Sequence, residues 1–245
     1  EMNGEVVFNT GMVGDPESLT DPSHTGQILT LTAPLIGNYG VPEDEKDEFG
    51  LMKNFESENI HINGLIVNEY CEKPSHWNSK LTLAKWLKNN KIPALQNIDT
   101  RALTQKLREN GTMLGKIIFD EKSKLKFHDP NKENLVAQVS IDKPITYKRG
   151  KKRVALIDCG VKNNIIRSLL KRNITVERVP WNYDIFDNKL KFDGVLLSNG
   201  PGDPQIVKKT HAIVKKCIDN TIPTFGVCLG NQMLAIASGA KTYKL

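Results

Sequence analysis

The chain has 245 residues, of which 39% are hydrophobic and 25% are charged, and its formal net charge is +6 at pH 7. This composition is typical of a globular protein, and the length fits one large domain or two ordinary ones. No run approaches the roughly 18 apolar residues of a membrane span, and the first residues form no apolar signal-peptide core. We therefore expect a cytoplasmic protein with no membrane partner.

The one dense run of basic residues is 148–153, and it contains no aromatic residue. We interpret the charge as dispersed surface lysine and expect no nucleic-acid partner. The four cysteines are far apart and form no CxxC pair, so we expect neither a disulfide framework nor a metal site. Reduced thiols fit a cytosolic environment. They are Cys71, Cys159, Cys217 and Cys228.

The first half of the chain predicts a mixed, strand-rich domain. Strands are expected over residues 5–9, 27–32 and 60–67, and the acidic stretch 42–48 is expected to be a surface loop. Two helices follow. One is expected over 80–90 with Ser79 as its cap, and the other over 100–110 between Asp99 and Gly111.

A segment without sustained periodicity, which carries Pro144, Gly150 and the basic run, is interpreted as a linker. We therefore divide the chain into a first domain (1–143), a linker (144–152) and a second domain (153–245). In the second domain, strands and helices alternate, which predicts an α/β fold with a mostly parallel sheet. The strands are expected over 154–157, 175–179, 194–197 and 223–227, and the helices over 162–172, 206–218 and 232–237.

The pattern with the clearest chemical meaning is Gly226-Val227-Cys228-Leu229-Gly230, where a short strand runs directly into a helix. This is the G-x-C-x-G form of a nucleophile elbow. The sharp turn needs small flanking residues and lifts the sulfur to the carboxyl end of the sheet. The helix N-terminus favours the thiolate, and the Leu229 N–H is placed to stabilise a developing oxyanion. For this pattern taken alone, a structural cysteine in an α/β turn is the default interpretation.

A second loop leaves the same edge of the predicted sheet, with the sequence Ser198-Asn199-Gly200-Pro201-Gly202-Asp203-Pro204. Two glycines and prolines make it rigid, and Gly202 offers an unobstructed N–H as a second oxyanion donor. An ordinary strand-to-helix turn is the alternative interpretation.

Together, SNGPGDP and FGVCLGNQ resemble the class I (triad) glutamine amidotransferases. The segments GEVVFNTGMVGDPESLTDPSHTGQI and 99–104 resemble the glutaminase-bearing small subunit of carbamoyl-phosphate synthase. Four further segments look most similar to the animal-type, multifunctional pyrimidine-pathway forms: LTAPLIGNYG, DEFGL, PSHW and SGAKTYKL. The resemblance covers nearly the whole chain.

The resemblance implies that Cys228 attacks the side-chain amide carbon of glutamine, giving a thioester and free ammonia. Leu229 and Gly202 are implied to supply the oxyanion N–H groups. The positions implied to bind glutamine are Ser23, Gly200, Gly202, Leu229 and Gln232.

The partner implied by the resemblance is a carbamoyl-phosphate synthetase, on the same chain or in a separate subunit, that receives ammonia through a tunnel. It uses ATP and Mg to combine ammonia with bicarbonate, in the first step of pyrimidine synthesis. No cofactor and no metal are expected in this segment itself.

The chain departs from the family at two places. First, Asn231 stands where many relatives have histidine. Second, the general base of the family is the histidine of a His-x-Glu pair, and none of the five histidines in this chain matches that position. We therefore expect a fragment that is inactive alone. Two other functions stay open: a cysteine α/β-hydrolase acting on esters or lactones, and a non-catalytic scaffold of an ammonia-dependent synthase. The nearest scaffold-type relatives lack the nucleophilic cysteine.

Overall fold

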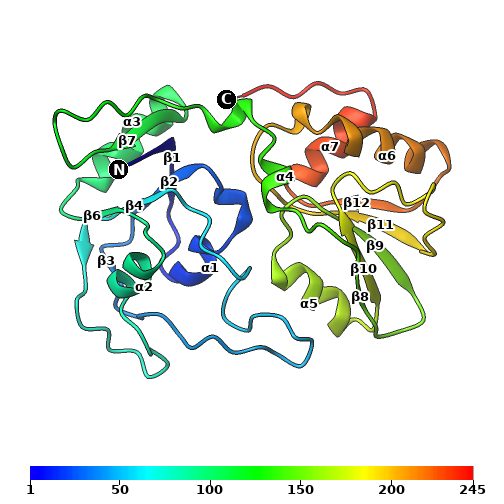
Figure 1. Cartoon of the computed structure of the whole chain (residues 1–245), viewed down its shortest axis with the longest axis horizontal. Coiled ribbons are helices and arrows are strands. Elements are labelled where there is room, and N and C mark those ends of the chain that lie inside the picture. The colour runs from blue at the N-terminus through cyan, green and yellow to red at the C-terminus, as the bar shows by residue number, and fades with distance from the viewer. Residues whose placement is uncertain (245) are drawn as a thin grey trace. The chain divides into compact units, whose positions relative to one another are not determined.

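The structure is a computed structural model that describes residues 1–244, and these divide into two compact units (Figure 1). The first unit comprises residues 1–45 and 52–130, and the second comprises residues 46–51 and 131–244. Each unit is built around its own five-stranded sheet. The α/β fold class expected from the sequence is confirmed.

The first unit contains a sheet with strand order β6-β4-β2-β1-β7, in which only β7 is antiparallel to its neighbour. One face packs on α1 and α2, and the other packs on α3. A small parallel pair, β3 with β5, lies outside this sheet. The bounds are β1 (Met2–Asn9), α1 (Asp15–Leu19), η1 (Pro22–His24), β2 (Gln27–Leu31), β3 (Leu35–Ile36), β4 (Gly64–Ile66), β5 (Glu69–Tyr70), α2 (Leu83–Asn89), β6 (Ala94–Leu95), α3 (Thr100–Asn110) and β7 (Met113–Ile117).

The two helices predicted in this unit have different outcomes. Helix α3 begins after Asp99, whose carboxylate accepts the Ala102 N–H at 2.9 Å, as the sequence predicts. The prediction that Ser79 caps the other helix is wrong. Thr82 is the cap of α2, because Leu81 is held in an extended bridge with another segment and the helix cannot begin earlier.

The second unit has strand order β12-β11-β9-β10-β8, and four of its strands are parallel. The remaining strand, β8, pairs antiparallel with β10 at one edge. The bounds are η2 (Pro130–Lys132), α4 (Leu135–Val139), β8 (Ile145–Tyr147), β9 (Arg153–Asp158), α5 (Asn163–Lys171), β10 (Thr175–Pro180), β11 (Gly194–Leu197), η3 (Pro204–Ile206), α6 (Lys208–Asp219), β12 (Thr224–Gly226) and α7 (Leu229–Ala237).

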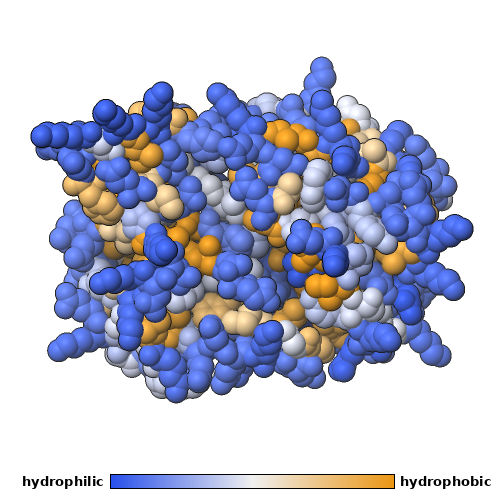
Figure 2. Space-filling model, in the orientation of Figure 1, coloured by the Kyte–Doolittle hydropathy of each residue, from blue (hydrophilic) through white to orange (hydrophobic). Residues whose placement is uncertain are grey.

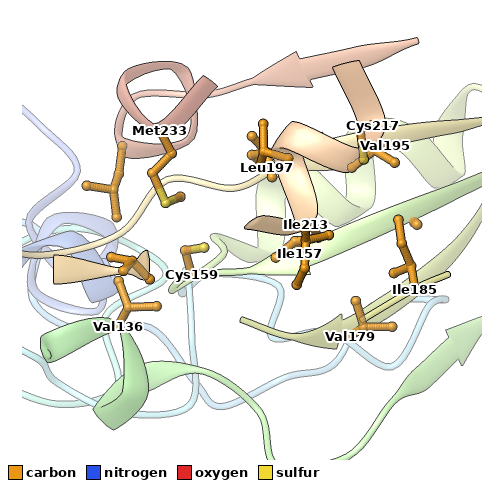
Figure 3. Close-up of a cluster of buried hydrophobic side chains, with 14 residues drawn as sticks. Val136, Ile157, Cys159, Val179, Ile185, Val195, Leu197, Ile213, Cys217 and Met233 are labelled. Carbon is orange, nitrogen blue, oxygen red and sulfur yellow. The ribbon is translucent and has the colours of Figure 1, made fainter. Parts of the chain in front are cut away.

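The sheet of the second unit is covered by helices on both faces. Alternate residues of the central strand β9 belong to opposite clusters: Ile157 packs with residues of α6 and α7 (Figure 3), and Leu156 packs with residues of α5. Both side chains are fully buried. Burial on both faces is what a parallel sheet requires, and it explains the uninterrupted apolar run Val154–Ile157 in the sequence.

Part of the segment expected to be a linker is a strand. Residues 145–147 form β8, and further along the Arg149 N–H donates to Thr175 Oγ1 at 2.9 Å. A β-carbon on Gly150 would lie 1.7 Å from the Asn173 carbonyl oxygen, so the chain passes directly against the second unit here. Three residues are too few for a strand periodicity to be visible in the sequence.

The acidic stretch 42–48 was expected to be a surface loop, but its last residues belong to the segment 46–51, which is part of the second unit. Leu51 is buried in the same cluster as Leu156 and Ile166. Asp47 forms an ion pair with Arg167 at 2.7 Å, and both side chains are about 15% exposed. Burial opposes the charged carboxylate, but its hydrogen bonds, chiefly with Arg167, lower the pKa of Asp47. Residues 46–51 are therefore a packed part of the second unit.

We expect Leu51→Ala to destabilise the second unit by about 2–5 kcal/mol, because it removes a fully packed side chain. The measurement is the urea midpoint of the second unit, followed by hydrogen exchange of the β9 amides. Glu48→Ala, an exposed neighbour, is the matched control. Equal midpoints for the two variants would contradict the assignment of this segment to the core.

On the face drawn in Figure 2, hydrophilic residues predominate and hydrophobic residues occur in scattered groups. Among residues 1–244, no helix is long and apolar enough to cross a membrane.

Candidate functional site

The turn between β12 and α7 holds Cys228 in a strained conformation. Its φ of 51° and ψ of −111° lie where non-glycine residues are rarely found. The side chain is exposed and the thiol is free. The preceding Val227 N–H donates to the Leu197 carbonyl at 3.0 Å, which ties the turn to the neighbouring strand β11. The neighbouring structure thus enforces the strain and presents the sulfur to solvent.

The two glycines of the elbow are required by close backbone contacts. A β-carbon on Gly226 would lie 2.5 Å from the backbone of Gly230 and of Asn231. A β-carbon on Gly230 would lie 2.3 Å from the Leu197 carbonyl oxygen. Real β-carbons do not approach backbone atoms this closely, so α7 can cross the strands here only with glycine at both positions.

Among residues 1–244, one N–H of the first turn of α7 has no hydrogen-bond partner. The N–H groups of Asn231 and Gln232 donate to the Cys228 carbonyl at 3.0 and 3.1 Å, and Gly230 N–H donates to Ser198 and Val227 carbonyls. The remaining one belongs to Leu229, the first helical residue, whose side chain is buried. This N–H directly follows Cys228, which is the position that the predicted role as an oxyanion donor requires.

The second predicted loop leaves the carboxyl end of β11, the strand that pairs with β12. Its first residues, Ser198 and Asn199, are buried. Gly200 passes so close to the neighbouring turn that a β-carbon would lie 2.0 Å from the Cys159 carbonyl oxygen. Gly202 has a φ of 82°, a conformation that favours glycine. The loop is thus fixed beside the elbow by its backbone.

Four of the five positions implied to bind glutamine lie in the second unit around this elbow. They are Gly200 and Gly202 in the loop, Leu229 at the start of α7, and Gln232 exposed one turn further along. Ser23 lies in the first unit, in η1, where its N–H donates to Asp21 Oδ1 at 2.9 Å. Its role toward glutamine stays a prediction.

In the comparisons with known proteins, each unit matches a family model. Residues 1–117 match the family model of the carbamoyl-phosphate synthase small chain, CPSase domain, and residues 155–245 match the class-I glutamine amidotransferase model. The first unit is thus similar to the small chain of carbamoyl-phosphate synthase, and the second unit is similar to the class-I glutamine amidotransferases. The resemblance stated from the sequence is therefore confirmed.

Relatives of several kinds align with nearly the whole chain. The multifunctional protein CAD of Squalus acanthias is 53% identical over 100% of this chain and 11% of its own length. The carbamoyl phosphate synthase arginine-specific small chain of Saccharomyces cerevisiae is 49% identical over 99% of this chain and 61% of its own. The mitochondrial carbamoyl-phosphate synthase [ammonia] of Homo sapiens is 46% identical over 99% of this chain and 16% of its own length. The chain thus spans between about a tenth and three fifths of these relatives.

The other cysteines of this small-chain relative differ from Cys228 in exposure. Cys159 and Cys217 are fully buried, and Cys71 is half-buried. Burial, and secondarily Asp158, raises the pKa of the Cys159 thiol well above its usual range. Burial also raises the pKa of Cys217 to about 11. Burial therefore disfavours the thiolate, the reactive form of cysteine, at both positions.

We therefore expect iodoacetamide at pH 8 to modify Cys228 first in the folded protein, with Cys71 slower. Cys159 and Cys217 should react only after unfolding, since their thiols are buried and protonated. Peptide mass spectrometry of a time course measures this, with Cys228→Ser as the control that should lose the fast phase. Early labelling of Cys159 would contradict the assignment of the nucleophile.

No histidine partner accompanies the sulfur in the described part of the chain. Between residues 1 and 244, no hydrogen bond joins Cys228 to any of the five histidines. His211 is the only histidine of the second unit. It lies on α6, and burial lowers its pKa. The described residues thus place an exposed cysteine at the elbow without a hydrogen-bonded histidine.

Sequence reasoning missed a buried ion pair beneath the loops of this family's site. Asp158 ends β9 and is fully buried, and it binds Arg178 of β10 at 2.8 Å. Burial disfavours the charged guanidinium, but Asp158 and Tyr147 outweigh this effect and raise the pKa of Arg178. A charged residue at the end of the apolar run Val154–Ile157, directly before a turn, was the available signal.

Proposed function

We propose that this chain carries the glutaminase site of a glutamine-hydrolysing carbamoyl-phosphate synthase. The Cys228 sulfur attacks the side-chain amide carbon of glutamine, and the negative charge that develops on the amide oxygen is stabilised by the N–H groups of Leu229 and Gly202. Collapse of this intermediate expels ammonia and leaves a thioester on Cys228. Water then hydrolyses the thioester to glutamate and regenerates the thiol.

The observation that carries this proposal is the exposed cysteine at an elbow whose strain, flanking glycines and unbonded helix N–H match the needs of acyl transfer. The two family matches support it, since one covers the amidotransferase unit and the other the CPSase unit. Within the second unit, Gly200, Gly202, Leu229 and Gln232 are proposed to bind glutamine, and Ser23 of the first unit is proposed as a further glutamine-binding residue.

The general base is proposed to be a histidine, oriented by a glutamate, that lies outside residues 1–244. The support is that the sulfur of Cys228 has no histidine partner in this part of the chain. A cysteine without such a base loses most of its activation. The chain by itself is accordingly proposed to release no ammonia from glutamine.

The ammonia is proposed to pass through a tunnel to synthetase domains that use ATP and Mg with bicarbonate. The support is that the relatives include a small chain, which implies a partner, and a multifunctional protein. Pyrimidine synthesis is preferred to arginine synthesis, because the 53% identity to CAD exceeds the 49% identity to the arginine-specific small chain. The cytoplasm is the proposed compartment.

A second function is favoured by other relatives. Carbamoyl-phosphate synthases [ammonia] from Aquarana catesbeiana and Homo sapiens are 48% and 46% identical to the chain. They raise the alternative of a non-catalytic scaffold for an ammonia-dependent synthase. The exposed thiol of Cys228 favours glutamine use, because a scaffold has no need of a strained, solvent-presented nucleophile.

The test compares nitrogen sources for carbamoyl phosphate synthesis by the whole protein that carries this chain. A glutaminase should support synthesis with glutamine as well as with ammonium, and glutamate should appear in equal amount to the product. Synthesis with ammonium alone would establish the scaffold. The 245-residue chain, assayed in parallel, should release no ammonia from glutamine, and release that depends on Cys228 would overturn the proposed external base.

A further inference from the structure

Asp158 uses both of its carboxylate oxygens inside the second unit. Oδ1 accepts the N–H groups of Gly160 and Val161, each at 2.9 Å. Oδ2 accepts the Ile141 N–H at 3.0 Å and two guanidinium N–H groups of Arg178 at 3.0 and 2.8 Å. A fully buried carboxylate with five donors fixes the conformation of whatever backbone supplies them. Here that backbone is the turn that follows β9.

The fixed turn is joined to the loop after β11 by two hydrogen bonds. The Cys159 N–H donates to Ser198 Oγ at 2.9 Å, and the Lys162 N–H donates to Asn199 Oδ1 at 3.1 Å. Ser198 Oγ in turn donates to the carbonyl of Asn199 at 2.7 Å. The acceptor side chains are buried, so water cannot replace these bonds without cost.

The loop is joined in the same way to the elbow. The Ser198 carbonyl accepts the N–H of Gly230 at 3.1 Å, and Gly230 lies two residues after the nucleophile. Gly200 has no room for a β-carbon against the Cys159 carbonyl, so this loop cannot shift toward the turn. A continuous set of bonds therefore runs from the turn held by Asp158 to Ser198 and Asn199, in the loop that contains Gly202, and from Ser198 to Gly230 in the first turn of α7.

We infer that Asp158, held by Arg178, is a positioning residue for the glutaminase reaction: it fixes the turn 159–162, which holds the loop 198–202 beside Cys228. The inference rests on the proposed function and names a residue of the same site. Asp158 is fully buried and both of its carboxylate oxygens accept protein donors. It acts through the backbone, by keeping the N–H of Gly202 in place when charge develops on the amide oxygen.

Asp158→Asn is the informative substitution, because it retains the size of the side chain and changes its chemistry. Every partner of the carboxylate is a donor, and the asparagine amide must present its own NH₂ group to one set of them. One side of the network is therefore lost. Glu177→Gln is the matched control, since Glu177 is a buried acid on β10, next to Arg178, whose hydrogen bonds go to Arg153 at 2.7 Å and to Thr146.

Two readouts test the inference, and the first does not depend on the proposed function. Hydrogen exchange in the 245-residue chain should accelerate at residues 159–162 and 198–202 in Asp158→Asn and stay unchanged there in Glu177→Gln. In the whole protein, Asp158→Asn should lower kcat for glutamine hydrolysis by about 100-fold. Glu177→Gln should keep kcat within about threefold, and synthesis with ammonium should be unchanged in both variants. If the wild-type protein does not hydrolyse glutamine, the proposed function fails and the exchange experiment still decides the role of Asp158.

Equal losses of kcat in the two variants would show general destabilisation and overturn the inference, as would unchanged exchange at 198–202 in Asp158→Asn. Ser198→Ala serves where Asp158→Asn does not fold, because it removes only a hydroxyl and with it one of the two hydrogen bonds that join the turn to the loop. It should speed exchange over 198–202 and lower kcat by about tenfold. Unchanged values for Ser198→Ala would also overturn the inference.

Discussion

Cys228→Ser should abolish glutamine-dependent carbamoyl phosphate synthesis by the protein that carries this chain, with a loss of about 10⁴-fold or more in kcat. The serine hydroxyl is far less ionised than a thiol and is a poorer nucleophile in the same position. Because the side chain is exposed, the substitution removes no core packing. The effect should therefore fall on the chemistry and leave the fold intact.

The decisive comparison is between nitrogen sources in the same variant. Cys228→Ser should retain synthesis with ammonium, since ammonium enters after the proposed glutaminase step. Cys71→Ser, at a half-buried thiol of the first unit, is the control that should retain both activities. Persistence of glutamine-dependent synthesis in Cys228→Ser would mean that another residue is the nucleophile, and loss of both activities would point to a structural role.

The elements that the sequence predicted well are those whose signals are local. Helix α3 carries its own cap and ends at Gly111, and β11 occupies the predicted residues 194–197 because it is a short apolar run between turn residues. The elbow also was visible, because glycines at both sides of a cysteine between a strand and a helix leave few other structures. In each case the residues that decide the structure are neighbours in the chain.

The elements that sequence reasoning missed depend on partners far away in the chain. Asp47 reaches Arg167 across 120 positions, and β8 exists because β10 offers it an edge. Ser79 has the chemistry of a helix cap, but Leu81 is held in a bridge with Val41. No pattern within a short window contains this information, so local propensity was overridden by tertiary contacts.

The candidate site divides in the same way. Cys228, Leu229 and the loop glycines could be named from motifs, because each motif lies within a few residues. The pair of Asp158 and Arg178 was missed, since its partners are 20 positions apart and its role depends on how strands β9 and β10 pair. The sequence offered a charge at the end of an apolar strand, and only the structure shows what that charge holds.

Gly230→Ala should destabilise the second unit by about 3 kcal/mol or more and lower glutaminase activity along with it. Two effects oppose each other at this position. Gly230 is in helix α7, where alanine is intrinsically favoured over glycine by about 1 kcal/mol. Against this, a β-carbon would lie 2.3 Å from the carbonyl oxygen and 2.7 Å from the carbonyl carbon of Leu197.

The contact decides the sign, because its partner is strand backbone that cannot move aside. Leu197 is central in the packing of β11 against α6 and α7 (Figure 3), so relief of the overlap must displace α7 instead. A displaced α7 carries Cys228 and the N–H of Leu229 with it. The loss of stability and the loss of activity therefore have the same cause.

Thermal and urea unfolding of Gly230→Ala measure the first effect, and glutamine hydrolysis by the whole protein measures the second. Asn231→Ala is the matched control, since it places alanine one residue further along the same helix at an exposed position. That variant should change the stability by less than about 0.5 kcal/mol. If Gly230→Ala were as stable as Asn231→Ala, helix propensity would outweigh the contact, and the close approach of α7 to β11 would not be what holds the elbow in its strained conformation.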